Sequence, residues 1–278
     1  MELLVVIAVI GLLSSIIFAI TRGADEQGRI AKGLYFSQHL HNSLGSWAAG
    51  IWSFDEGAGT TANDISGWDN NGTLVNTPTW RCATTDPSYT PSGQGCSLEF
   101  NGSTQYVNVE NNTSLNIANT ITVEAWVKFN SLPGGAGADI IDRGCNGYSI
   151  WLRGDNKKFS FIKQCDGSTS ANQSTTVASV AVWYHIAGTY DGSIFRIYVN
   201  GKLENSLSYT TTFTSIANIA IGKGGDGFVN GLIDEVRIYA TSLSLSQVQS
   251  QYYVGLERLL AKNLIDEQEY QQRLLTKI

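Results

Sequence analysis

The sequence has little charge, and basic residues are outnumbered by acidic ones. Asp, Glu, Lys and Arg make up 15% of its 278 residues, and 24 acidic against 18 basic residues leave a net charge of -6. A protein that binds nucleic acid needs a basic stripe to replace phosphate counterions. The composition therefore argues against a nucleic-acid partner, and the abundant Asn, Ser and Thr suit an uncharged polar surface.

Common catalytic and metal-binding patterns are also missing. The chain contains no Gly-x-Ser-x-Gly, no His-Glu-x-x-His and no phosphate-binding loop. It has no Cys-x-x-Cys, and its three histidines are remote from the cysteines. His39 and His41 are two residues apart and would lie on different faces of a helix. A thiolate or histidine metal site is therefore not expected.

The four cysteines allow three disulfide pairings. Cys145 and Cys165 are symmetric about Asp155, at the centre of a hairpin signal, which would place them opposite one another. Cys82 and Cys96 would then close a loop rich in Pro, Gly, Ser and Thr. Because disulfides persist mainly outside the cytoplasm, the pairs Cys82–Cys96 and Cys145–Cys165 favour an exported protein over a cytosolic one with free thiols.

An apolar run from Leu3 to Ile20 opens the chain. Its 18 residues are near the lower limit for a helix that crosses a bilayer. The alternative is a cleaved signal peptide, but no basic segment precedes the run and no small-x-small site clearly closes it. Glu2 stands at its start, and a carboxylate near lipid is costly without a partner. We therefore expect a retained anchor over residues 3–20.

The order Glu2-Leu-Leu-Val-Val-Ile-Ala-Val-Ile-Gly-Leu-Leu-Ser resembles the N-terminal helix of type IV pilins and type II secretion pseudopilins. The resemblance implies that Glu2 pairs with the N-terminal amine of a neighbouring subunit. It implies other pilin subunits as partners, a single-pass inner-membrane form, and a cell-surface fibre after assembly. The basic leader and the cleavage glycine of that family are absent, and Met1 stands where the family carries isoleucine. We expect that the natural reading frame continues upstream.

An amphipathic stripe follows the apolar run. Its apolar members recur at spacings of three, four and six and predict a helix ending near residue 50: Ile30, Leu34, Leu40, Leu44 and Trp47. Such a stripe would pack a stalk against a head domain, or serve as a linker helix packing on its own sandwich. Both readings predict nearly the same contacts.

Short alternating segments separated by turn residues occupy residues 51–253, which is typical of an antiparallel sandwich. The strongest hairpin signal is Asn200-Gly201, because a type I′ turn needs two residues that tolerate positive φ.

Six phrases in this region resemble the laminin G/concanavalin A-like jelly-roll family. They begin at Trp52, Leu98, Ile121, Trp183, Ile197 and Gly231, and they occur in the family's order. The resemblance implies a jelly-roll sandwich over 51–253. With the pilin-like helix over 1–50 and a helical hairpin over 254–278, we expect a mainly β chain of three parts. Such domains mostly bind glycans or proteins, or act as spacers.

The same resemblance implies a structural Ca²⁺, which prefers acidic and carbonyl oxygens. The candidate ligands are Asp234 with Asp55 or Glu56; the alternative is that Asp234 bonds only to loop amides. Consecutive aspartates common in the family are replaced by Thr104 and Gln105 here, which removes two charges.

An enzymatic role is not expected. Jelly-roll glycosidases commonly carry their two carboxylates on one strand as Glu-x-Asp-x-x-Glu, and this string is absent. Asp234 and Glu235 are adjacent, so on a regular strand they would point to opposite faces. His185 lies in a strand phrase and is expected in the core.

Glycan recognition requires an exposed aromatic ring beside hydrogen-bonding groups. Trp68 and Asn70 in one loop, and Phe228 in another, are the candidate ligand contacts; a lid over the core edge is the alternative role for Trp68. Four further tryptophans lie in strand-like segments and are expected in the core: Trp52, Trp126, Trp151 and Trp183.

The tail from Leu256 onwards predicts a short helical hairpin, with a stop at Asn263 and a capping box formed by Asp266 and Glu269. It could dock on its own sandwich or contact a partner.

Three functions fit these features. The first is a minor pilin or pseudopilin that displays the sandwich for adhesion, glycan or protein recognition. The second is a membrane-tethered lectin-like protein that never enters a fibre. The third, which the missing carboxylate pattern disfavours, is a polysaccharide hydrolase.

Overall fold

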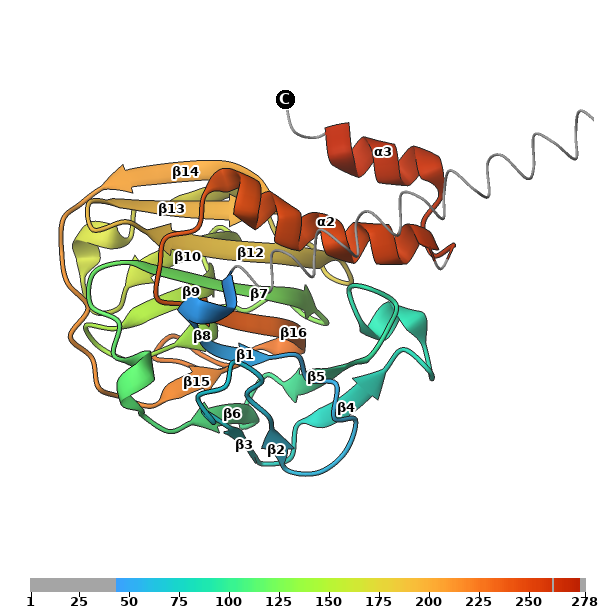
Figure 1. Ribbon diagram of the computed structural model, residues 1–278, viewed down its shortest axis with the longest axis horizontal. Coiled ribbons are helices and arrows are strands. Elements are labelled where there is room, and N and C mark those ends of the chain that lie inside the picture. The colour runs from blue at the N-terminus through green and yellow to red at the C-terminus, as the bar shows by residue number, and fades with distance from the viewer. Residues whose placement is uncertain (1–43, 262, 276–278) are drawn as a thin grey trace, which may run out of the picture.

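The computed structural model describes residues 44–261 and 263–275, which form two stacked antiparallel sheets with two helices against the outer face of one of them (Figure 1). Residues 1–43 of the predicted pilin-like helix, which include Glu2 and the membrane segment over residues 3–20, lie outside the described residues. Within the described part, no helix combines the length and apolarity needed to cross a membrane.

The first sheet, sheet A, carries eight strands. Its order is β14-β13-β12-β7-β16-β5-β4, and β1 also pairs with β16. The strands are β1 (Ala48–Trp52), β4 (Thr79–Cys82), β5 (Cys96–Asn101), β7 (Ile121–Phe129), β12 (Trp183–Tyr190), β13 (Ile194–Val199), β14 (Lys202–Ser208) and β16 (Asn230–Tyr239).

The second sheet, sheet B, also has eight strands, in the order β11-β10-β9-β8-β15-β6-β3-β2. They are β2 (Thr61–Ala62), β3 (Gly72–Val75), β6 (Tyr106–Val109), β8 (Gly137–Asp142), β9 (Tyr148–Arg153), β10 (Lys158–Lys163), β11 (Gln173–Val177) and β15 (Ile219–Ile221). Short 3-10 turns η1 (Gly45–Trp47), η2 (Pro87–Tyr89), η3 (Thr113–Leu115) and η4 (Gly167–Thr169) lie between strands.

The main core fills the space between the two sheets. Aromatic rings meet there from opposite sides, with Phe129 of β7 against Phe159 of β10, and Phe161 of β10 against Phe195 of β13. A Cβ at Gly188 of β12 would lie 2.2 Å from the Phe161 ring, so this position accommodates only glycine. The antiparallel sandwich predicted from the alternating segments is confirmed.

Helix α2 (Leu245–Ala261) covers the centre of sheet A on its other face and crosses the sheet in Figure 1. Helix α3 (Glu267–Leu275) packs against α2. Trp126 of β7 packs there with Tyr252 and Leu256 of α2. Because β7 is covered on both faces, every one of its nine residues is buried, whereas the edge strand β14 has none that is buried.

The start of the sandwich differs from the sequence prediction. The amphipathic stripe predicts helix as far as residue 50, but Ala48–Trp52 forms strand β1 beside β16. The Trp47 carbonyl accepts a hydrogen bond from the Ala240 amide, which ties the chain to the sheet just before the strand. Tertiary pairing therefore overrides the helical pattern at these residues.

Both predicted disulfides are present, Cys82–Cys96 and Cys145–Cys165. The hairpin that brings the second pair together is formed by β9 and β10, with Tyr148 opposite Lys163. Asn200 and Gly201 both have positive φ between β13 and β14, which confirms that hairpin as well.

The helical hairpin of the tail is also confirmed. Asn263 has a φ of 55° after the end of α2, and the Glu269 amide donates to the Asp266 carboxylate at 2.7 Å. Ile265 and Tyr270 are buried in one cluster with Trp126. The hairpin therefore docks on its own sandwich, the first of the two roles expected for it.

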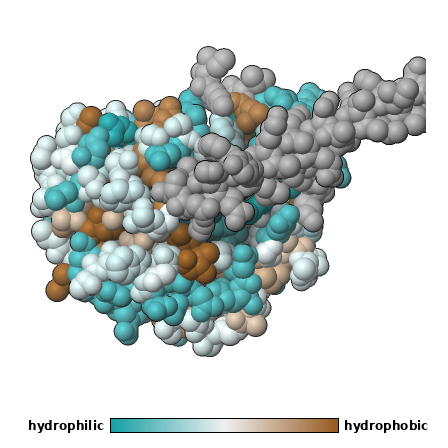
Figure 2. All heavy atoms as spheres, in the orientation of Figure 1, coloured by the Kyte–Doolittle hydropathy of each residue, from teal (hydrophilic) through white to brown (hydrophobic). Residues whose placement is uncertain are grey.

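The visible face of the molecule is mostly hydrophilic or neutral, with apolar residues in separate patches (Figure 2). Among the most exposed of the large apolar side chains is Trp68, at 54%.

The close approach of α2 to sheet A depends on Gly255. A Cβ at this position would lie 3.0 Å from Cζ2 of Trp126. Gly255→Val improves helix propensity slightly, but its branched side chain collides with the indole, so we expect a loss of about 1–3 kcal/mol in unfolding free energy. Denaturant unfolding measures it. Gln249→Val, at a partly exposed position of the same helix, is the control, and equal losses in both variants would contradict the proposed contact.

Candidate functional site

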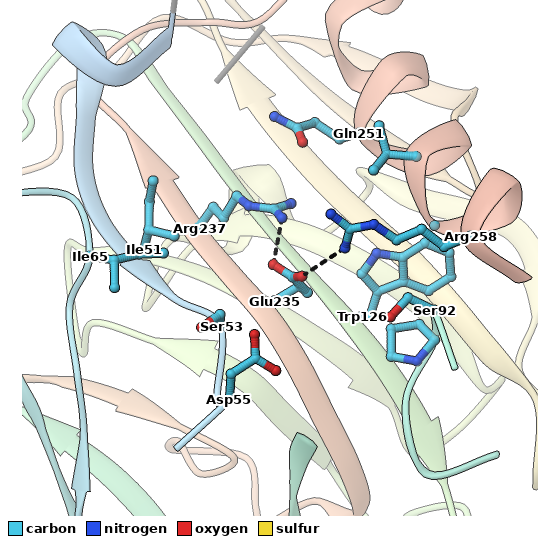
Figure 3. A pocket seen from close by; sticks show the side chains of 13 residues that line it. Ile51, Ser53, Asp55, Ile65, Ser92, Trp126, Glu235, Arg237, Gln251 and Arg258 are labelled. Atoms are coloured by element: carbon cyan, nitrogen blue, oxygen red, sulfur yellow. Dashed lines mark hydrogen bonds and ion pairs between the residues drawn. The ribbon is translucent and has the colours of Figure 1, made fainter. Parts of the chain in front are cut away.

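A cavity of about 480 Å³ opens on the outer face of sheet A, beside α2 (Figure 3). Strands β1, β7 and β16 form its floor, α2 forms one wall, and the loop before β5 forms another. About half of its lining is polar or charged, from Ser53, Asp55, Ser92, Glu235, Arg237, Gln251 and Arg258, and the rest includes Trp126, Ile51 and Ile65. Its volume lies within the range of about 300–1,000 Å³ that is usual for ligand pockets.

A β-bulge in β16 builds the floor of this cavity. Asp234 pairs with Trp126 of β7 and Arg237 with Glu124, so two residues of β16 face one of β7. Glu235 adopts a φ of 51° within the bulge. Ile233 and Val236 both belong to the core between the sheets, so the two acids between them lie on the outer face. The prediction that Asp234 and Glu235 point to opposite faces is therefore wrong.

Arg237 connects two carboxylates across the floor. Its guanidinium lies 2.5 Å from Glu235 and 3.1 Å from the fully buried Glu124. Burial lowers the pKa of Arg237, but the two carboxylates outweigh it and the net shift is upward, so the charge is retained. Burial likewise raises the pKa of Glu124, but His185 and Arg237 lower it overall. His185 is fully buried beside Glu124, as expected for a core residue.

Arg258 reaches into the cavity from α2. Its guanidinium lies 4.0 Å from Glu235, on the side opposite the sheet, and about a third of its side chain is exposed. Figure 3 shows Arg237 and Arg258 directed toward Glu235 from the strand and from the helix. Glu235 thus lies between the two cations at one opening.

Asp55 faces this group from the loop after β1. Its carboxylate accepts the Cys96 amide at 3.0 Å, and a Cβ at Gly95 would lie 1.8 Å from its oxygen. Desolvation against this loop raises the pKa of Asp55, the Cys96 amide lowers it, and Glu235 raises it further; the net shift is upward. The Cys82–Cys96 disulfide closes the loop at its base and so fixes the wall that Asp55 contacts.

The candidate calcium ligands accept hydrogen bonds from separate backbone amides, and calcium binding stays a prediction. Asp234 is buried and accepts the Glu235 amide at 2.7 Å, and burial raises its pKa well above the ordinary value. Glu56 instead accepts the Asn63 amide at 2.6 Å. Within residues 44–261 and 263–275, no group of three or more His, Cys, Asp and Glu side chains is arranged to hold a metal ion.

The loop aromatics predicted to contact a ligand lie apart. Trp68 is exposed, and its indole N–H donates to the Ala48 carbonyl at 2.9 Å, which fixes the ring beside β1. Phe228 lies by sheet B, where the Lys223 ammonium is 5.7 Å from its ring. Asn70 is only 3% exposed, and its amide donates to Ala49 and Ser114. The prediction that Asn70 contacts a ligand is therefore wrong, because it holds the loop together.

Three of the four strand tryptophans are buried as predicted: Trp52, Trp126 and Trp151. The prediction that Trp183 is a core residue is wrong, because it is the first residue of β12 and is only partly buried. Of the side chains in the cavity, the sequence singled out only Asp55 as a candidate ligand. Arg237 sits in a strand phrase, but its role depends on the bulge, and Arg258 lies in the tail helix, where nothing in the pattern marks it.

A family model described as the concanavalin A-like lectin/glucanases superfamily matches residues 101–249. The chain belongs to this superfamily. Curated protein sequences gave no match.

Solved structures resemble this superfamily member in fold. Domain 4 of an extracellular GH43 arabinanase from Geobacillus stearothermophilus, in complex with arabinotriose, matches with a TM-score of 0.57 and 21% identity, over 73% of this chain and 97% of that one. The binding domain of Paraclostridial Mosquitocidal Protein 1 matches with a TM-score of 0.58 and 18% identity, over 77% of this chain and 53% of that one. Trypanosoma rangeli sialidase in complex with sialic acid matches with a TM-score of 0.55 and 15% identity, over 80% of this chain and 38% of that one.

The chain thus spans about half of the mosquitocidal binding domain and 38% of the sialidase. At these identities the likeness shows a shared fold.

A second group of carboxylates, missed by the sequence reasoning, lies on sheet B. Asp139 is fully buried, accepts the Ser149 hydroxyl and the Asp226 amide, both at 2.9 Å, and neighbours Asp142. Burial, followed by the charge of Asp142, raises the pKa of Asp139 to about 7. No spacing in the sequence marks this group, because the strand pairing assembles it.

The raised pKa of Asp139 predicts a pH-dependent stability. The folded chain keeps this proton up to about pH 7, whereas the unfolded chain releases it near 3.8. The contribution of protonated Asp139 to the free energy of unfolding is therefore fully present below pH 3.8 and is lost as pH rises to 7. Relative to Asp139→Asn, we expect the wild type to lose about 2–4 kcal/mol between pH 4 and 7. Chemical denaturation across this range measures the difference, with exposed Asp155→Asn as control. Parallel pH profiles for wild type and Asp139→Asn would contradict it.

Proposed function

We propose that this protein is a carbohydrate-binding module displayed outside the cytoplasm, and that the charged cavity beside α2 is its sugar site. The observation that carries the proposal is the arrangement of Arg237, Arg258, Glu235 and Asp55 around one opening next to Trp126. Sugar hydroxyls donate and accept hydrogen bonds, so fixed carboxylates and guanidiniums can bind them together.

The charges in the cavity favour a neutral sugar. Two carboxylates, Asp55 and Glu235, face two guanidiniums, Arg237 and Arg258, and Glu235 is already paired with both cations. An anionic ligand would have to displace Glu235 from its partners, whereas hydroxyl groups can bond at the edges of the existing pairs. Arabinotriose, bound by the structurally similar arabinanase domain, is a suitable first probe.

The proposed role is binding without hydrolysis. Glycosidases need one carboxylate that donates a proton and a second that acts as base or nucleophile. The Glu235 carboxylate lies 2.5 Å from the Arg237 guanidinium and 4.0 Å from that of Arg258, so both oxygens face cations. Asp55 is held by the Cys96 amide.

We further propose, from the pilin-like order of residues 2–14, that the module is displayed by a membrane-anchored subunit that enters a pilus or pseudopilus. The two disulfides support an oxidising compartment. Recovery in sheared fibre fractions, lost on Glu2→Ala, would support assembly, and extraction only as a detergent-solubilised monomer would contradict it.

The sugar site is tested by replacing Arg258. Its side chain is about a third exposed and pairs weakly, so Arg258→Ala should leave folding intact. We expect it to weaken binding of the best glycan from an immobilised panel that includes arabinotriose by about tenfold or more, which is about 1.4 kcal/mol. Calorimetric titration measures the affinity.

The matched control is Arg153→Ala, which removes an arginine from sheet B that pairs with Asp155. Equal losses in the two variants, or no binding to any member of the panel by the wild type, would contradict the proposed site. Release of arabinose from arabinotriose would contradict binding without hydrolysis.

A further inference from the structure

A surface loop borders the charged cavity and follows strand β1. It spans residues 64–70, between β2 and β3. Its Ile65 amide donates to the Ile51 carbonyl at 2.9 Å, and both isoleucines line the cavity (Figure 3). Farther along the loop, the Trp68 indole N–H donates to the Ala48 carbonyl at 2.9 Å. The loop therefore runs beside β1 from the edge of the cavity to the start of the strand.

This loop is held in one conformation by Asp64. The buried Asp64 carboxylate accepts the Ile51 and Ser66 amides, both at 2.8 Å, the Ser66 hydroxyl at 2.7 Å and the Asn70 amide at 3.0 Å. Asn70 in turn donates to the Ala49 carbonyl at 2.7 Å. Because the backbone is already ordered, a side chain on this loop binds a ligand with little further loss of conformational entropy.

Trp68 presents an open aromatic face on the ordered loop. Its side chain is 54% exposed, and its single polar atom is already bonded to the Ala48 carbonyl. Such exposure argues against the role of a lid over the core edge. The exposed part of the ring is therefore apolar, which suits stacking against the C–H face of a sugar. Asp69, next in the chain, is exposed and offers oxygens to sugar hydroxyls.

The indole and the charged group lie at two levels of the same strand. Ile51 pairs with Arg237 of β16, whereas Ala48, which binds the indole, lies three residues earlier. Three residues of extended strand cover about 10 Å. A single sugar ring is too short to contact both the Arg237 guanidinium and the Trp68 ring. A chain of sugars can contact both, and it would pass over Ile65, which is 56% exposed.

We propose that Trp68 forms a second subsite and that the ligand is an oligosaccharide longer than a disaccharide, lying along β1. This inference rests on the proposed sugar site in the charged cavity. One sugar of the chain bonds to the guanidiniums and carboxylates there, and a later sugar of the same chain stacks on the Trp68 indole. A disaccharide occupies the cavity alone.

The test is calorimetric titration of the full chain with arabinobiose, arabinotriose and arabinohexaose. We expect the wild type to bind arabinohexaose about tenfold or more tighter than arabinobiose, because only the longer chain reaches the indole. Trp68→Ala should remove most of this gain and leave arabinobiose binding unchanged. Trp68→Phe keeps an aromatic ring and should retain most of the gain. Arg258→Ala should weaken the binding of all three oligomers by similar factors.

The control is Ile216→Ala, which removes an apolar side chain that is 72% exposed, between β14 and β15, and should change no affinity. Thermal unfolding should show the same melting temperature for Trp68→Ala as for this control, because both side chains are largely exposed.

The second subsite and the cavity fail in different ways. A gain with chain length that persists in Trp68→Ala, or equal affinities of the wild type for the three oligomers, overturns the second subsite while the cavity stands. Loss of arabinobiose binding in Trp68→Ala overturns it as well. If no arabinose oligomer binds, the second subsite is overturned, and the Arg258-dependent signal on the glycan panel decides separately whether the cavity binds another sugar.

Discussion

The packing of α2 on the outer face of sheet A, through Trp126, is the interaction on which the rest of the structure depends. Without the helix, β7 and β12 would expose Trp126 and His185 to solvent. With it, the indole stacks on Tyr252 at a centroid distance of 5.6 Å and lies beneath the Gly255 backbone. The same indole lines the charged cavity and also a second, more apolar cavity of about 460 Å³, which extends toward β12 and α3. The Trp126 ring thus both anchors α2 on sheet A and lies between two cavities of different chemical character.

The electrostatics of the charged cavity follow from the same covering. Once α2 covers the sheet, Glu124 loses its water and requires the Arg237 guanidinium and the His185 ring as partners. Arg237 in turn holds Glu235, and the β16 bulge aims that carboxylate at the opening. The ion pairs of Arg237 therefore have two effects. They compensate the buried charge of Glu124, and they place charged groups in the cavity that can bind a polar ligand.

Sequence patterns predicted elements whose cause is local. The Asn200-Gly201 turn, the Asp266 cap and the disulfide across the β9–β10 hairpin are each specified by neighbouring residues, and each is present. The functional surface could not be predicted in the same way. Glu235 reaches the cavity only because the β16 register shifts against β7, and Arg258 only because its helix docks at that place. Asn70 looks like a loop ligand in the sequence, but the fold turns it inward, and β1 replaces the end of a predicted helix because strand pairing with β16 decides the local conformation.

The disulfide between Cys82 and Cys96 links the two cavities to a single loop. The loop that it closes supplies Ser92 to the first cavity, Thr90 to the second, and Pro91 to both, and none of these residues belongs to a strand. Cys82 also faces Cys96 across the β4–β5 ladder, so one covalent bond and one strand pair bound the segment that shapes both cavities.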